Sequence, residues 1–78
     1  MVIEIDNWQT LVNKTVFSAD GKDVGVVADI QPNSILVKYG PITPDKYIIP
    51  KSSINRFEKG VVYLAESGSV VKHEYKFE

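Results

Sequence analysis

The sequence predicts an all-β fold, a small barrel of about six short antiparallel strands with at most one short helical turn near the N-terminus. Short segments with β-like alternation recur along the chain, and Gly, Pro, Asn and Asp separate them at near-regular intervals. No segment shows helical periodicity over an ordinary helix length. The 78 residues leave room for one core, so we expect a single domain at 1–78.

The N-terminal segment combines a short β-like stretch with one helical turn. Residues 2–5 (VIEI) alternate but are few. Asp6 or Asn7 is suited to cap the turn that follows. Asn13 is suited to end it, because Asn tolerates the left-handed conformation. The turn would place three apolar residues on one face: Trp8, Leu11 and Val12.

The first predicted hairpin joins strands at 14–19 and 23–31 through a turn at Gly21, which is free to take positive φ. Gly25 lies within the second strand, where a missing side chain allows a close backbone approach or a bulge. Strict alternation places Val24, Val26, Ala28 and Ile30 on one side of that strand. It places Asp23, Gly25, Val27 and Asp29 on the other.

Four more strands follow, the last two of them as a second hairpin. Residues 35–40 alternate, with Ile35, Val37 and Tyr39 on one face, and a loop with two prolines follows. A short strand at 46–50 is closed by Pro50, and 51–54 suits one tight turn. Extended structure resumes at 54–58, a two-residue Lys-Gly turn follows, and 61–65 forms the last confident strand.

The C-terminal segment, 67–78, fits two structures. As an extended chain, which we favour, it places Val71, His73, Tyr75 and Phe77 on one face. As a helix, it would be capped by Ser67 or Ser69, with Val71 and Tyr75 as one i, i+4 pair. The extended form could cover a sheet edge or pair with another chain. It makes Val71, Tyr75 and Phe77 the candidate surface for self-association or partner binding.

Composition excludes several classes of protein. The absence of cysteine excludes disulfides, thiolate metal sites and cysteine catalysis. The single histidine argues against a His-rich zinc site, and a net charge of −1 argues against binding through phosphates. The N-terminus lacks the basic region of a signal peptide, and no apolar run approaches the ~20 residues that span a bilayer. We expect a cytoplasmic protein with no membrane insertion.

The polar residues predict neither catalysis nor a cofactor. A calcium loop needs closely alternating oxygen ligands, whereas an apolar strand separates Asp23 from Asp29. Asp20, Asp23 and Asp29 are therefore interpreted as turn and strand residues. A serine triad would need His73, but no serine lies in a glycine elbow. We expect no enzyme, no cofactor and no bound metal.

Three stretches resemble the PRC-barrel family: NKTVFSADGKDVGVVADI, ILVKYG and YIIPKSSINRFEKGVVYL. Family members are similar in a Gly-Lys-x-Val opening, a glycine-led hairpin and a later Ile-Pro step into a final hairpin. The resemblance covers 14–64 and leaves 65–78 as a C-terminal extension. Its motif residues here are Asn13, Gly21, Gly25, Asp29 and Pro50. Asn13 stands where the family usually has glycine.

The resemblance implies a non-catalytic β-barrel that binds proteins and often associates with itself. The family occurs in the photosynthetic reaction-centre H subunit and in a ribosome maturation factor. Its stand-alone archaeal members are linked to cell division as partners of the division protein SepF. The expectation is therefore an adapter or scaffold of this archaeal type, a homodimer, with SepF as a candidate partner.

The alternative is a ribosome- or RNA-associated module. Small barrels bind single strands with aromatic platforms flanked by cations. The candidate pairs are Lys38-Tyr39, Lys46-Tyr47 and Arg56-Phe57. Strand alternation instead predicts that these aromatic side chains pack inward while the basic neighbours point outward. Together with the net charge, this makes nucleic-acid binding the less favoured hypothesis.

Overall fold

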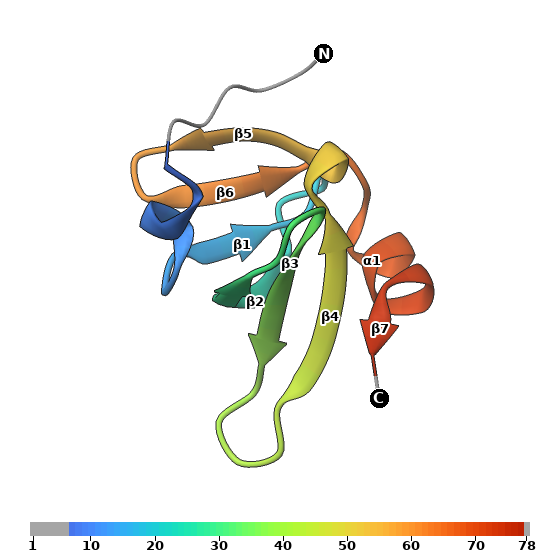
Figure 1. Cartoon of the computed structure of the whole chain (residues 1–78). Coiled ribbons are helices and arrows are strands. Elements are labelled where there is room, and N and C mark those ends of the chain that lie inside the picture. The colour runs from blue at the N-terminus through green and yellow to red at the C-terminus, as the bar shows by residue number, and fades with distance from the viewer. Residues whose placement is uncertain (1–6, 78) are drawn as a thin grey trace.

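The computed structural model describes residues 7–77, which form one seven-stranded sheet with one α-helix and two short 3-10 helices (Figure 1). The strands are β1 (Thr15–Phe17), β2 (Asp23–Ile30), β3 (Ser34–Tyr39), β4 (Asp45–Pro50), β5 (Ile54–Glu58), β6 (Val61–Leu64) and β7 (Lys76–Phe77). The helices are η1 (Trp8–Leu11), η2 (Lys51–Ser53) and α1 (Gly68–Glu74). The β-like stretch at 2–5 lies outside the described residues.

The strands follow the order β5-β6-β1-β2-β3-β4-β7 across the sheet. The β-rich character predicted from the sequence is confirmed, but the sheet is mixed rather than antiparallel throughout, because β6 crosses over to pair with β1 in parallel. The described pairing runs from β5 at one edge to β7 at the other and closes no ring. The prediction of a purely β fold is also wrong, because the C-terminal segment contains a helix.

The N-terminal turn forms as the sequence predicts. The amide of Gln9 donates to the side chain of Asn7 (3.1 Å), which therefore caps η1. Leu11 is fully buried in the core, and Asn13 leaves the turn with φ 71°. The left-handed conformation that makes Asn an acceptable substitute for glycine is thus present.

Two bulges overturn the strict alternation predicted for β2. Val16 pairs with Gly25 and Phe17 with Asp23, so Val24 has no partner on β1. A second register shift lies between Val27 and Asp29, opposite β3. Each extra residue reverses the inside-outside order of the strand. Val24 and Val27 are therefore buried together, whereas Val26, predicted to face the same way as Val24, is 41% exposed.

The β3–β4 and β5–β6 hairpins are more regular. The six residues of β3 pair with the six of β4 without a shift. Pro50 ends β4 and η2 provides the predicted tight turn. Lys59 and Gly60 both have positive φ (53° and 76°), as a two-residue type I′ turn requires. The tip of the β3–β4 hairpin extends beyond the rest of the sheet (Figure 1).

The favoured extended form of the C-terminal segment is wrong for 68–74, which form α1. Ser67 caps this helix by accepting from the amide of Val70. The helix turns Val71 into the core, where it is fully buried, and Tyr75 packs against the same core. Val71 therefore does not belong to an exposed surface. Only Lys76 and Phe77 are extended, and they pair with β4.

Candidate functional site

The two faces of the β3–β4 hairpin differ in what covers them. Residues directly opposite one another on antiparallel strands share a face. The inner face carries buried residues of the core: Ile35, Val37, Tyr47 and Ile49. The outer face carries Lys38 directly opposite Lys46, both exposed. The register of this hairpin therefore separates a buried face from an outer face that is exposed at Lys38 and Lys46.

The outer face continues across four strands as a single row. Val26 of β2 is opposite Lys38, and Phe77 of β7 is opposite Lys46. Val26 is 41% exposed and Phe77 is 53% exposed. We call Val26, Lys38, Lys46 and Phe77 the outer row. It consists of two adjacent ammonium groups with an exposed apolar side chain at each end.

The charges of the outer row are not compensated within the described part of the chain. Like charges directly opposite each other in a sheet are destabilising. Asp45, next to Lys46 in sequence, is 3.7 Å from the ammonium of Lys76 instead. No salt bridge to Lys38 or Lys46 is present among residues 7–77. The two lysines thus lie in an arrangement that does not favour folding.

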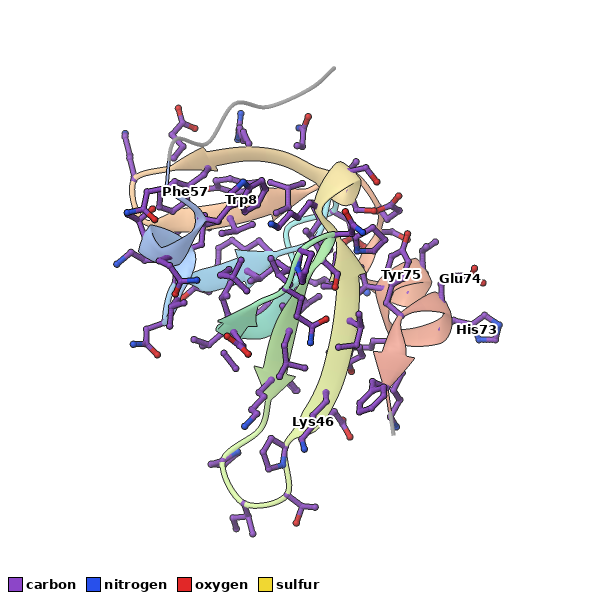
Figure 2. All side chains as sticks on the ribbon, viewed as in Figure 1. Trp8, Lys46, Phe57, His73, Glu74 and Tyr75 are labelled. Atoms are coloured by element: carbon purple, nitrogen blue, oxygen red, sulfur yellow. The ribbon has the colours of Figure 1, made fainter. Side chains whose placement is uncertain are left out.

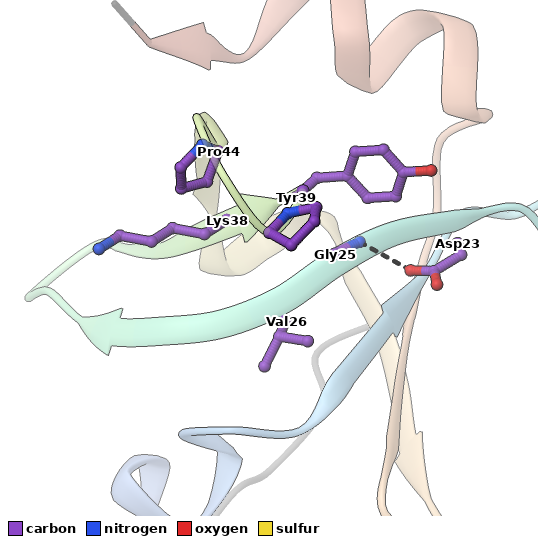
Figure 3. A pocket seen from close by; sticks show the side chains of 8 residues that line it. Asp23, Gly25, Val26, Lys38, Tyr39 and Pro44 are labelled. Atoms are coloured by element: carbon purple, nitrogen blue, oxygen red, sulfur yellow. Dashed lines mark hydrogen bonds between the residues drawn. The ribbon is translucent and has the colours of Figure 1, made fainter.

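A rigid apolar tip lies beside the outer row. Residues 40–44 connect β3 to β4 and contain two prolines, and Ile42 between them is 90% exposed. A groove of about 560 Å³ is bordered by Val26, Lys38, Tyr39 and the two prolines (Figure 3). The sequence had suggested no role for this loop. An isoleucine between two prolines was the available signal, because such a loop cannot insert it into a core strand.

The aspartates of the first hairpin make local hydrogen bonds. The hydroxyl of Ser18 and the amide of Gly68 (3.1 Å) both donate to Asp20, and they hold the pKa of that carboxyl below its usual value. The amide of Gly25 donates to Asp23 (2.9 Å; Figure 3). No cluster of three potential metal ligands occurs among residues 7–77. The hydrogen bonds of Asp20 tie the first turn to α1, and that of Asp23 lies within the start of β2, as is common for turn and strand aspartates.

Among the other motif positions, Gly21 has φ 81° and open space around it, as its turn requires. Asp29 is exposed on β2, and its carboxylate accepts from the amide of Ile30 (2.8 Å). Gly21 therefore allows the turn, and Asp29 bonds its own strand. Neither residue is part of the outer row.

A shallow hollow lies over α1, bordered by Glu66, Ser69, Val70, His73, Glu74 and Tyr75. His73 and Glu74 are exposed and point away from the sheet (Figure 2). The Oγ of Ser69 lies 3.3 Å from that of Ser67, and within the described chain no hydrogen bond joins it to His73. The hollow therefore lacks the serine–histidine contact of an activated nucleophile.

Two of the three aromatic residues considered for nucleic-acid binding pack inward. Tyr47 is 2% exposed, and its burial raises the pKa of its hydroxyl. Phe57 packs against the core as a partly buried side chain (Figure 2). Tyr39 alone is exposed (42%), with the ammonium of Lys72 5.7 Å from its ring. The three residues therefore do not form a shared stacking platform.

Comparison with protein-family models, curated proteins and solved structures gave no match for this chain. Within residues 7–77, no helix has the length and apolar character needed to cross a bilayer. The geometry of the outer row and the tip is therefore the basis for inferring a function.

Proposed function

We propose that this protein is a non-catalytic interaction module, an adapter or scaffold that presents the outer row and the hairpin tip to a protein partner. The observation that carries the proposal is the outer row itself. Its ends, Val26 and Phe77, expose apolar side chains on neighbouring strands of the sheet, one on each side of the two lysines. Exposed apolar side chains rimmed by polar groups are typical of protein-binding surfaces.

The tip supports the same proposal. Prolines at 41 and 44 restrict the backbone beside Ile42. The loop would therefore lose little conformational entropy when a partner binds it. The apolar side chain of Ile42, 90% exposed, is available to enter a pocket. The resemblance of 14–64 to PRC barrels adds a specific candidate partner, the division protein SepF.

Self-association is part of the proposal, on a smaller surface than the sequence suggested. Val71 lies in the core, but Tyr75 is half-buried and Phe77 is exposed beside β4. A second copy would therefore contact Tyr75 and Phe77 rather than the lysines of the outer row. Sedimentation at high micromolar concentration distinguishes a homodimer, which requires these residues, from a monomer that binds only other proteins.

The test is capture of proteins from native extract, with and without nuclease treatment, on three immobilised chains. These are the unchanged chain, the Val26→Ser/Phe77→Ser variant and the control Val70→Ser. Val70 is 37% exposed on α1, so the control removes a similar side chain away from the outer row. We expect the unchanged chain and the control to retain the same protein, and the outer-row variant to lose it. Purified SepF is the first protein to be tested directly.

Equal retention by all three chains would contradict the proposal, as would capture that nuclease abolishes. The second result would instead favour the ribosome- or RNA-associated alternative. Circular dichroism of each variant establishes that its sheet is intact, and both substituted positions are exposed, so little core packing is lost.

A further inference from the structure

We propose that the outer row recognises an extended acidic segment of a partner protein, with the pattern apolar-x-acidic-x-apolar. This inference rests on the proposed function and adds the chemistry of the partner. The carboxylate would lie between Lys38 and Lys46, while the apolar side chains would contact Val26 and Phe77. Three features support this partner in turn: the charge of the row, its spacing and the absence of the pattern from residues 1–78.

The first feature is charge. Cβ atoms of directly opposite residues lie roughly 5 Å apart, so the ammonium groups of Lys38 and Lys46 can approach one common anion. A carboxylate accepts through two oxygens and can bond both donors at once. Neither lysine has a salt bridge within residues 7–77. A partner's Asp or Glu would therefore replace a like-charge repulsion by two attractions.

The second feature is spacing. From Val26 to Phe77 the outer row crosses three gaps between neighbouring strands, and gaps of ~4.8 Å make a span of about 14 Å. In an extended segment, residues i, i+2 and i+4 share one side and span about 13 Å. A segment lying across the strands therefore places apolar groups over both ends of the row and its central side chain over the two lysines.

The third feature concerns the source of that segment. No Asp or Glu in the 78 residues has an apolar residue both two positions before and two positions after it. Leu64 precedes Glu66 at this spacing, for example, but Gly68 follows. Residues 1–78 of a second copy therefore do not supply the pattern, and the segment we propose is that of a different protein. A nucleic acid would offer phosphates, but the apolar ends of the row favour aliphatic partners over phosphates.

The experiment selects binders from a random dodecapeptide phage library on three chains. These are the unchanged chain, Lys38→Gln/Lys46→Gln, and the charge-matched control Lys14→Gln/Lys59→Gln, which alters lysines away from the outer row. We expect the unchanged chain and the control to select peptides with an acid two residues from an apolar residue on each side. A synthetic peptide of that consensus should bind the Lys38/Lys46 variant about ten-fold more weakly.

Several outcomes would overturn the inference. They are failure to select any peptide, a consensus without acids, or equal binding to the Lys38/Lys46 variant. A dodecamer of deoxythymidylate that binds the unchanged chain and not this variant would assign the row to nucleic acid instead. If the extract protein still depends on Val26 and Phe77 while the peptides fail, the proposed function stands and only the acidic pattern is wrong.

Discussion

The β1–β2 and β3–β4 hairpins of the same sheet are built in opposite ways. β1–β2 contains a bulge and a glycine at φ 127°, and its turn is bonded to the segment before α1, where the amide of Ala19 donates to the carbonyl of Glu66 (2.7 Å). β3–β4 pairs without a shift, ends in two prolines and projects from the sheet (Figure 1).

The two hairpins therefore have different roles: β1–β2 bends the sheet around the core, and β3–β4 holds exposed side chains at fixed positions. Bulges increase the local twist and bend a strand. The bent β2 pairs with both β1 and β3, and it buries the side chains of Val24 and Val27. The regular hairpin instead keeps one face constant along its length, which holds exposed side chains at fixed spacing. We therefore expect substitutions in β1–β2 to affect stability and substitutions on the outer face of β3–β4 to affect binding.

The largest expected effect is that of Gly25→Val. A Cβ at this position would lie 2.3 Å from the carbonyl oxygen of Lys38, and the φ of 127° is strained for any L side chain. We expect the free energy of unfolding to fall by roughly 3 kcal/mol or more, measured by urea denaturation. Gly21→Asn, where φ is 81° and nothing lies within 4 Å, is the matched control and should cost much less. Equal effects would show that the close approach is unimportant.

A smaller effect is expected at Asp20, which joins the turn of the first hairpin to α1. The hydrogen bond from Ser18, then that from Gly68, lowers the pKa of the Asp20 carboxyl. Because the folded pKa lies below the unfolded one, the stabilisation is present above the unfolded value, about 3.9, and is lost as pH falls through the folded value. Asp20→Ala should lower the melting temperature near neutral pH, and the difference from the unchanged chain should narrow in acid.

Asp20→Asn serves as the control, because it retains an oxygen acceptor but no charge. A difference between Asp20→Ala and the unchanged chain that persists undiminished at pH 2 would contradict the role of the ionised carboxylate. Because Gly68 lies at the start of α1, the loss of stability in Asp20→Ala also measures how much the contact between the first turn and α1 contributes.

The accuracy of the sequence predictions differs between the two hairpins for a physical reason. Strand period and turn residues depend on local chemistry, so the face of β3, Pro50 and the Lys59–Gly60 turn were predictable. The bulges of β2 depend on contacts with two neighbouring strands, so Val26 was assigned to the wrong face. For the candidate site, the sequence named Phe77 as part of a self-association surface and Lys38 and Lys46 only within the less favoured nucleic-acid hypothesis, and it did not show that the three lie in one row. Val71 was misassigned because capping by Ser67 and burial favour a helix over the alternation of the segment.

The smallest change in the free energy of unfolding is expected for Lys46→Glu, and it is a gain in stability. Lys46→Glu places a carboxylate directly opposite Lys38 and replaces repulsion by attraction, so the free energy of unfolding should rise by roughly 0.2–1 kcal/mol. Lys46→Gln removes the repulsion alone and should fall between the two. Lys59→Glu, an equal charge change in the β5–β6 turn, controls for net charge and should give no comparable gain. The same Lys46→Glu chain should lose binding to acidic peptides. A variant that is more stable and binds acidic peptides less would show that the outer face of β3–β4 favours recognition at the expense of folding. A loss of stability would instead mean that the two opposed lysines do not repel each other appreciably. The charge argument for an acidic partner would then be wrong.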